Sequence, residues 1–217
     1  MNGSMTGLFI TIEGIDGSGK STQATRLARW LERETGRDVV HTFEPGGWEG
    51  GSALRSLILN GSVPDTETEL LLFMADRSGH IGSVIRPALN AGKIVLCERY
   101  EDSTWAYQVG GGRLAPERAE ELMNFCAFPK PNLTVFLDIE PDEAASRMRA
   151  RGKMDRIENS GLEFSARVAS AYRQRAAAYP ERFLTVAAGG TEDEVALLVE
   201  RGVAEFFGPL LRKGARP

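Results

Sequence analysis

The chain has 217 residues, of which 42% are hydrophobic and 26% charged, and this length suits one α/β domain with a well-buried core. A formal net charge of -4 argues against a general binder of nucleic-acid polymers or membrane surfaces, because such proteins normally carry a basic excess. Two cysteines without metal-ligand spacing indicate a reducing, cytoplasmic setting without a zinc site. No apolar run is long enough to cross a membrane.

The two ends of the chain differ in composition from the part between them. Residues 1–7 are polar, contain glycine and lack the features of a secretory signal, so we expect a disordered N-terminal tail. Residues 8–209 are expected to form a single domain, and residues 210–217 a C-terminal tail.

The first predicted strand, over residues 8–13, runs into a glycine-rich segment. That segment consists of Gly14, Ile15, Asp16, Gly17, Ser18, Gly19, Lys20 and Ser21. It matches the P-loop pattern, in which glycines turn backbone N–H groups inward onto a phosphate chain at the start of a helix. Lys20 is expected to reach the phosphate oxygens and Ser21 to hold Mg²⁺, and with Thr22 the segment predicts an ATP site.

The remaining elements alternate between helix and strand. Further strands are predicted over 38–43, 93–98, 133–138 and 183–187. Helices are predicted over 22–34, 52–59, 66–91 with a bend near Pro87, from 141 onward, over 162–179 and over 191–207. This alternation predicts a five-stranded parallel sheet in a three-layer α/β/α arrangement. Ligands of such sheets gather at the carboxyl ends of strands, where Asp16, Glu44, Glu98, Arg99 and Asp138 fall.

Three later patches could serve a second substrate, although each also has a plainer interpretation. Phe73 and Arg77 share one helix face and could stack on and hydrogen-bond a nucleobase, or be a core Phe beside a surface Arg. Arg99 follows a strand and could clamp a phosphate, or form an ordinary surface salt bridge. Basic residues from 147 to 156 could form a mobile lid that stabilises a phosphoryl-transfer transition state, or a solvated helix face.

Taken in order, these motifs resemble those of the thymidylate kinases of the nucleoside-monophosphate kinase group, from Phe9 to about Phe207. The resemblance rests on the P-loop with Asp16 and on five later motifs. These are Glu-Pro-Gly-Gly from Glu44, Leu-Leu-Phe-Met-Ala-Asp-Arg over 71–77, the segment from Arg-Tyr to Ala-Tyr-Gln over 99–108, Leu-Asp at 138, and Arg-Ala-Arg-Gly with Asp-Arg-Ile-Glu over 149–158.

The resemblance implies a cytoplasmic, homodimeric P-loop kinase that uses ATP and Mg²⁺ to phosphorylate dTMP to dTDP. It implies a small helical lid over about 147–160, of the bacterial type in which the lid supplies arginines. The implied catalytic residues are Lys20, Asp16, Arg99, Arg149, Arg151 and Arg156. The implied dTMP site consists of Asp16, Glu44, Phe73, Arg77, Arg99, Ser103, Tyr107 and Gln108. Ser21, Asp16 and Glu98 are the implied Mg²⁺ ligands.

The chain departs from the family pattern at several positions. Phe43 replaces a common Arg before Glu-Pro-Gly-Gly, and Glu98 replaces the usual Asp before the phosphate-clamping Arg. Trp48 stands where a small hydroxyl residue is typical, and the glycine run after Gln108 is one residue longer. We expect these changes to alter metal or acceptor geometry without changing the reaction class.

Two other functions fit the motifs. One is a related P-loop kinase that acts on a different nucleotide or a deoxynucleoside, which substrate profiling would distinguish. The other is a nucleotide-dependent switch that hydrolyses slowly. The chain has no Asn-Lys-x-Asp motif for reading guanine, and a switch would not need the lid arginines or the Phe73 and Arg77 pair.

Overall fold

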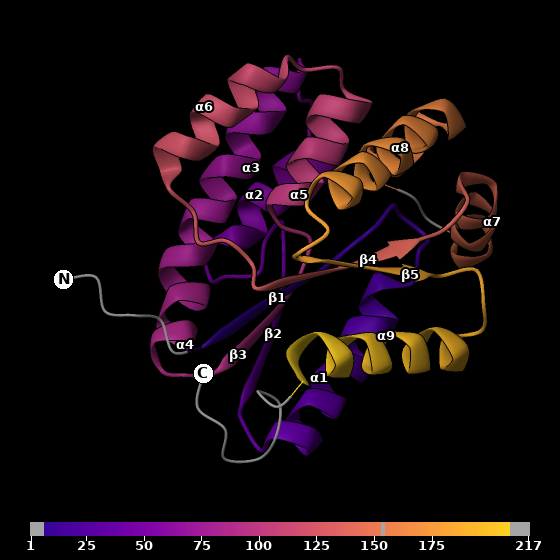
Figure 1. Cartoon of the computed structure of the whole chain (residues 1–217). Helices are drawn as coiled ribbons and strands as arrows, with labels where there is room; N and C mark the ends of the chain where they lie inside the picture. The colour runs from indigo at the N-terminus through magenta and orange to yellow at the C-terminus, as the bar shows by residue number, and fades with distance from the viewer. Residues whose placement is uncertain (1–6, 153–154, 209–217) are drawn as a thin grey trace.

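The computed structural model describes residues 7–152 and 155–208, in which five parallel strands form a single sheet (Figure 1). The strands are β1 (Leu8–Glu13), β2 (Val39–Phe43), β3 (Ile94–Glu98), β4 (Leu133–Asp138) and β5 (Phe183–Ala187). Their order across the sheet is β2-β3-β1-β4-β5, and all four pairings are parallel. The predicted five-stranded parallel sheet is therefore confirmed.

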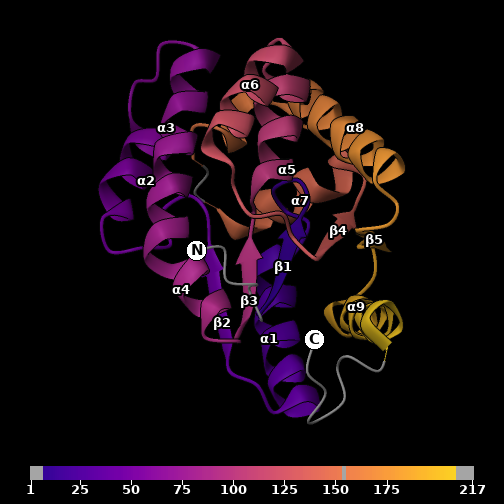
Figure 2. The same ribbon diagram turned by 60° about the vertical axis from the view of Figure 1, so that its left-hand side comes forward.

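Helices cover both faces of this sheet (Figures 1 and 2). The helices are α1 (Lys20–Thr35), α2 (Gly51–Asn60), α3 (Thr66–His80), α4 (Arg86–Asn90), α5 (Glu101–Thr104), α6 (Pro116–Cys126), α7 (Pro141–Arg151), α8 (Leu162–Ala178) and α9 (Glu192–Phe207). Two π-helical segments, η1 (Ile81–Ile85) and η2 (Trp105–Gly111), and the 3₁₀ turn η3 (Glu158–Ser160) complete the described elements. Helices α1 and α9 lie together on one face of the sheet, and α3, α5, α6 and α8 lie on the other.

The core follows from the composition of the strands. β1, β3 and β4 are apolar along nearly their whole length and buried on both faces, as the parallel topology requires. One apolar cluster joins the sheet to α1, α8 and α9, and a second packs α3, η1 and α6 against β3. The carboxyl ends of the strands are thereby held in a rigid frame.

Several boundaries differ from those expected from the sequence. Helix α1 begins at Lys20 rather than at residue 22, because the P-loop turns directly into it after Gly19. The helix predicted over 66–91 is interrupted by η1, whose wider turn directly precedes α4, where Pro87 is the second residue. Helix α6 was not predicted as a separate element.

The terminal segments were expected to be tails. Gly7 instead belongs to the fold, since its N–H donates to the carbonyl of Leu89 at 2.9 Å. Residues 1–6 and 209–217 lie outside the described residues, so neither tail is otherwise assessed. In the part of the chain that is described, no helix combines the length and apolar character needed to cross a membrane.

Candidate active site

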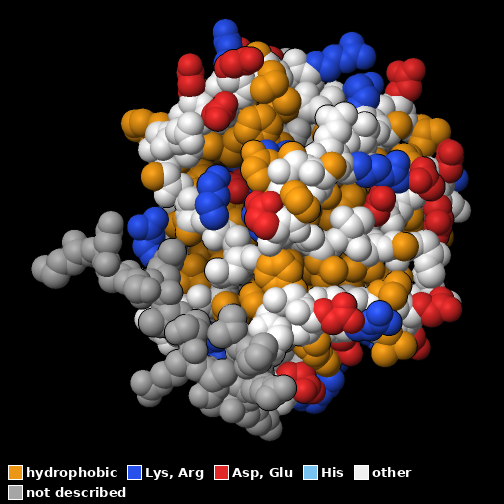
Figure 3. All heavy atoms as spheres, viewed as in Figure 1, with side chains coloured by type: hydrophobic (Ala, Val, Ile, Leu, Met, Phe, Trp, Pro, Cys, Tyr) orange, Lys and Arg blue, Asp and Glu red, His pale blue; other side chains and the backbone are white. Residues whose placement is uncertain are grey.

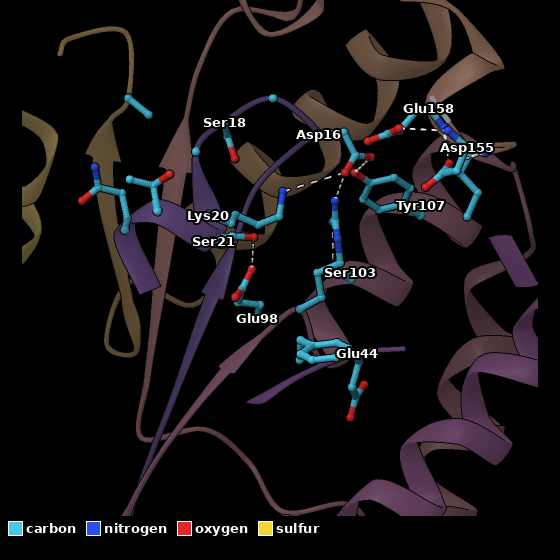
Figure 4. A pocket seen from close by; sticks show the side chains of 18 of the residues that line it. Asp16, Ser18, Lys20, Ser21, Glu44, Glu98, Ser103, Tyr107, Asp155 and Glu158 are labelled. Atoms are coloured by element: carbon cyan, nitrogen blue, oxygen red, sulfur yellow. Dashed lines mark hydrogen bonds and ion pairs between the residues drawn. The ribbon is translucent and has the colours of Figure 1, made fainter. Parts of the chain in front are cut away.

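The carboxyl ends of β1, β2 and β3 open into a cleft with a volume of about 890 Å³ (Figure 4). Most of the predicted site residues line it. They are Asp16, Gly17, Ser18, Gly19, Lys20, Ser21, Thr22, Glu44, Phe73, Arg77, Glu98, Arg99, Ser103, Tyr107 and Gln108. A cleft of this size is large enough for small-molecule ligands.

Left-handed glycines shape the P-loop. Gly14, Gly17 and Gly19 have φ angles of 148°, 85° and 89°, a region that other residues rarely adopt. A Cβ atom on Gly17 would also lie 2.4 Å from the carbonyl oxygen of Ala144 in α7. The loop thus needs glycine both for its turn and for its close approach to α7.

Lys20 lies buried inside this loop. Its Nζ donates to the carbonyl oxygens of Gly14 at 3.0 Å and Ile15 at 2.8 Å. Burial, together with the cation of Arg99, lowers the pKa of Lys20 to about 7. An arriving phosphate would offset this burial cost and favour the charged amine.

Asp16 is the centre of an ionic cluster at the mouth of the P-loop. It pairs with Arg99, accepts a hydrogen bond from the Tyr107 hydroxyl at 2.8 Å, and lies 4.0 Å from the Nζ of Lys20. Burial alone would raise the pKa of Asp16, but the cations of Arg99 and Lys20 outweigh it and lower the pKa to about 2. The carboxylate is therefore ionised at neutral pH.

Arg99 has an unusual backbone conformation, with a φ of 64° that is rare for residues other than glycine. The turn is held on both sides, because the Arg99 N–H donates to Ile12 at 3.0 Å and the Tyr100 N–H donates to the Glu13 carboxylate at 2.7 Å. The strained turn directs the guanidinium toward the P-loop, where Nη1 donates to the Gly14 carbonyl at 3.2 Å.

A buried polar network lies at the floor of the cleft. Arg77 is only 1% exposed, and its Nε donates to Glu44 at 2.7 Å. The other carboxylate oxygen of Glu44 contacts Nδ1 of His80 at 3.0 Å. Glu44, His80 and Cys97 are close enough to hold a metal ion, but the carboxylate is already engaged by Arg77 and His80. The interpretation of Arg77 as a surface residue is thus wrong.

Ser21 and Glu98 form a cluster of hard oxygen donors beside the P-loop. The Ser21 hydroxyl donates to Oε2 of Glu98 at 2.5 Å, and Nε2 of His41 contacts Oε1 at 2.9 Å. Burial raises the pKa of Glu98, but hydrogen bonds from His41 and Ser21 reverse this effect and lower the pKa below its ordinary value. A hydroxyl and an ionised carboxylate this close together fit the preference of Mg²⁺ for oxygen ligands.

The opposite wall carries aromatic and amide groups. Phe73 of α3 is half-buried at the cleft, and Gln108 of η2 donates to Glu69 at 2.7 Å. Ser103 of α5 donates to Glu13 at 2.6 Å, also contacts the Tyr172 hydroxyl at 2.7 Å, and lies 3.5 Å from Nη1 of Arg99. The wall can therefore present both an apolar surface and hydrogen-bonding groups to one ligand.

Of the lid arginines predicted to be catalytic, the two whose side chains are described do not line the cleft. Arg149 is exposed on α7, Arg156 pairs with Glu69, and the side chain of Arg151 lies outside what is described. The lining contains Arg147 instead, whose guanidinium donates to the carbonyl of Ala188 at 2.9 Å.

The lining also includes residues that were not among the predicted site residues. Asp155 and Glu158 lie across the cleft from Lys20, as Figure 4 shows. Gln23 closes the end nearest the P-loop helix, together with Thr191 of the loop before α9 and Glu192 at the start of α9. Gln23 lies two residues after the P-loop pattern, which was the available signal. Asp138, at the end of β4, pairs with Arg173 and does not line the cleft.

Comparison with known proteins identifies the family of this arrangement. The family model described as thymidylate kinase matches residues 12–198. A thymidylate kinase of Ectopseudomonas mendocina is 45% identical over 88% of this chain and 92% of its own length. One of Bifidobacterium longum is 41% identical over 93% of this chain and its own full length. The crystal structure of thymidylate kinase from Ehrlichia chaffeensis superposes with a TM-score of 0.76 at 31% identity, covering 91% and 98% of the two chains.

Proposed function

Since the chain belongs to the thymidylate kinase family, we propose that its cleft binds ATP at the P-loop and dTMP on the opposite wall. The enzyme transfers the γ-phosphoryl group of ATP to dTMP and so produces dTDP. The ion pair between Arg99 and Asp16 of the P-loop is the main support for the site assignment. It places Arg99, the proposed phosphate clamp after β3, against the loop that binds ATP.

The P-loop residues bind the phosphates of ATP. Their inward N–H groups and the start of α1 attract the anionic chain, and Lys20 moves from the loop carbonyls to the phosphate oxygens. Ser21, Glu98 and Asp16 would hold Mg²⁺, which would neutralise negative charge on the phosphates. Gln23 and the loop before α9 border the space for the adenosine group.

The dTMP site is assigned by the chemistry of its wall. Phe73 stacks on thymine, and Arg77 hydrogen-bonds the carbonyl edge of the base. Glu44, Thr104 and the Tyr100 carbonyl use three of the five N–H groups of Arg77, so its plane is fixed while two remain for a ligand.

Polar groups complete the dTMP site. Ser103, Tyr107 and Gln108 enclose the sugar and base, and Glu44 holds Arg77 in place. Asp16 and the Tyr107 hydroxyl, 2.8 Å apart, face the acceptor sugar.

The guanidinium of Arg99 binds the phosphate of dTMP. The reaction breaks the bond between the γ-phosphorus and the bridging oxygen of ADP, and forms a bond from that phosphorus to an oxygen of the dTMP phosphate. That phosphate is already anionic, so no general base is needed. Positioning and charge neutralisation by Lys20 and the arginines therefore account for most of the catalysis.

The segment of about residues 147–160 acts as the lid, and Arg149, Arg151 and Arg156 are assigned to catalysis when it closes. In the present arrangement the charge of Arg156 is neutralised by Glu69, and closure would have to exchange this partner for phosphate oxygens. Lid closure also excludes water, which limits wasteful hydrolysis of ATP.

A homodimer in the cytoplasm is the proposed form of the enzyme. Leu57 of α2, Leu71 of α3 and Phe125 of α6 are exposed on neighbouring helices, and Phe125 is 86% exposed. No nucleic-acid or membrane partner is proposed. On the face shown in Figure 3, Lys and Arg side chains are interspersed with Asp and Glu side chains.

Coupled detection of ADP release tests the assignment. With Mg²⁺ and ATP present, dTMP should be strongly preferred over dUMP, dCMP, dGMP, AMP and thymidine. Arg99→Ala should raise the KM for dTMP far more than the KM for ATP. Preference for another acceptor would contradict the dTMP site, and unchanged kinetics in Arg99→Ala would remove Arg99 from it.

A further inference from the structure

Glu98 and His41 come together because β2 and β3 are adjacent parallel strands. In their register Phe43 lies opposite Glu98, and His41 is two residues earlier on the same side of the sheet. His41 Nε2 reaches Oε1 of Glu98 at 2.9 Å. Since an ionised carboxylate can only accept, Nε2 of His41 carries the proton of this hydrogen bond.

The residue directly opposite Glu98 cannot provide this contact. Phe43 has an apolar ring, and the guanidinium of Arg55 lies over it at 5.2 Å while donating to the carbonyl of Pro45 at 2.6 Å. Arg55 is therefore engaged by the loop after β2. Of the side chains in the described residues, the hydrogen bonds to the Glu98 carboxylate come from His41 and Ser21.

These two hydrogen bonds fix the orientation of the carboxylate. Oε1 faces His41. Oε2 faces the Ser21 hydroxyl at 2.5 Å (Figure 4). Glu98 has one more rotatable bond than aspartate, so a free side chain would lose more rotamer entropy on binding a cation. The contact with His41 imposes that restriction before the cation arrives.

We propose that His41 is a positioning residue for the divalent cation, since it holds Glu98 with one carboxylate oxygen directed toward Ser21. This inference rests on the metal site assigned under the proposed function. Hydrogen-bond partners behind a metal ligand commonly change metal affinity by about 10- to 100-fold. His41 thus supplies the hydrogen-bond donor to Glu98 that Phe43, the residue directly opposite Glu98, cannot provide.

Binding of Mn²⁺ to the ADP-saturated enzyme tests this role without requiring turnover. Electron paramagnetic resonance measures free Mn²⁺ during a titration, and His41→Ala should weaken Mn²⁺ binding by about tenfold. His41→Gln retains an N–H donor of similar reach, so its Mn²⁺ affinity should stay within about threefold of the parent value. In a Glu98→Asp background the shorter carboxylate no longer reaches His41, so adding His41→Ala should have little further effect.

Val39→Ala and Ser21→Ala distinguish a failure of the role of His41 from a failure of the metal site. Val39→Ala lies on the same strand and face without contacting Glu98, so Mn²⁺ affinity should not change. An equal loss in Val39→Ala would attribute the effect to the strand and overturn the role of His41. Weak binding in Ser21→Ala but unchanged binding in His41→Ala would also overturn it, while leaving the proposed function intact. Unchanged affinity in Ser21→Ala would instead refute the metal site itself.

Discussion

The carboxylate of Glu13 accepts a hydrogen bond from the backbone N–H of Tyr100 at 2.7 Å, and so ties the end of β1 to the turn after β3. Oε2 of the same carboxylate accepts from Ser103 at 2.6 Å and Tyr172 at 2.8 Å. The strained Arg99 lies inside this turn. Glu13 thereby couples the P-loop strand to the proposed phosphate clamp without facing the ligand itself.

Glu13→Gln should mainly damage use of dTMP. The amide group cannot accept at both former carboxylate positions, so at least one donor among Tyr100, Ser103 and Tyr172 loses its acceptor, at a cost of about 1–3 kcal/mol. We expect the KM for dTMP to rise by roughly tenfold and the KM for ATP by much less. Steady-state kinetics with each substrate varied separately measures this split. Equal increases in both constants would show that Glu13 supports the P-loop and the clamp alike.

Binding of nucleotide should be accompanied by proton uptake at Lys20. Because the pKa of the buried amine is about 7 without ligand, most of Lys20 is neutral at pH 8, and bound phosphate restores its charge. Calorimetry of Mg·ADP binding in buffers with different ionisation enthalpies should give an uptake of up to about one proton at pH 8. In Lys20→Met the uptake should be largely lost. Identical uptake in both proteins would assign the proton to another group.

The buried pair of Arg77 and Glu44 should be strongly coupled in stability. Arg77→Ala leaves the buried Glu44 carboxylate with His80 as its remaining side-chain partner among the described residues, and should lower the free energy of unfolding by about 3–5 kcal/mol. Arg77→Met and Glu44→Gln each remove one charge of the pair, and the double variant removes both. The double variant should lose less free energy of unfolding than the sum of the losses in these two single variants. Urea denaturation of the single and double variants measures this coupling. Strict additivity would mean that the ion pair contributes no interaction energy of its own.

The parts of the fold that depend on local patterns could be predicted from the sequence. Apolar runs indicated all five strands, and eight consecutive residues matched the P-loop pattern. Boundaries were less accurate where tertiary contacts decide them, as at Lys20, where the loop turns directly into α1. The π-helical segment η2 has no simple periodic signal, because its wider turn depends on packing against α8.

The candidate site was predicted residue by residue, but its connections were not. Glu13 and Tyr172 are 159 positions apart, and no local spacing indicates that they meet. The sequence predicts only that His41 lies in the strand over 38–43, and its contact with Glu98 follows from the register with β3. Burial of Arg77 in α3 likewise depends on Glu44, which follows β2 and lies 33 positions earlier in the chain. Motifs and the family resemblance indicated candidate ligands, whereas the pairs that orient them emerge only in the folded chain.

Asp16 should make stability depend on pH in the acidic range. Its pKa is about 2 in the folded protein and 3.8 for the ordinary group, so the unfolded chain binds more protons between these values. Stability from Asp16 is therefore fully present above about pH 4 and is lost as pH falls toward 2, amounting to about 2 kcal/mol. The side chain is 24% exposed, and solvent screening makes this an upper figure.

Asp16→Asn should therefore be less stable than the parent protein at pH 6, with the difference shrinking toward pH 3. Urea unfolding at several pH values measures this, with Asp38→Asn as the control. Asp38 is 76% exposed and pairs with Lys93 at 3.0 Å, so its removal should cost less than about 1 kcal/mol at pH 6. A difference between Asp16→Asn and the parent that stays constant with pH would mean that packing of the side chain, rather than its charge, stabilises the cluster with Arg99.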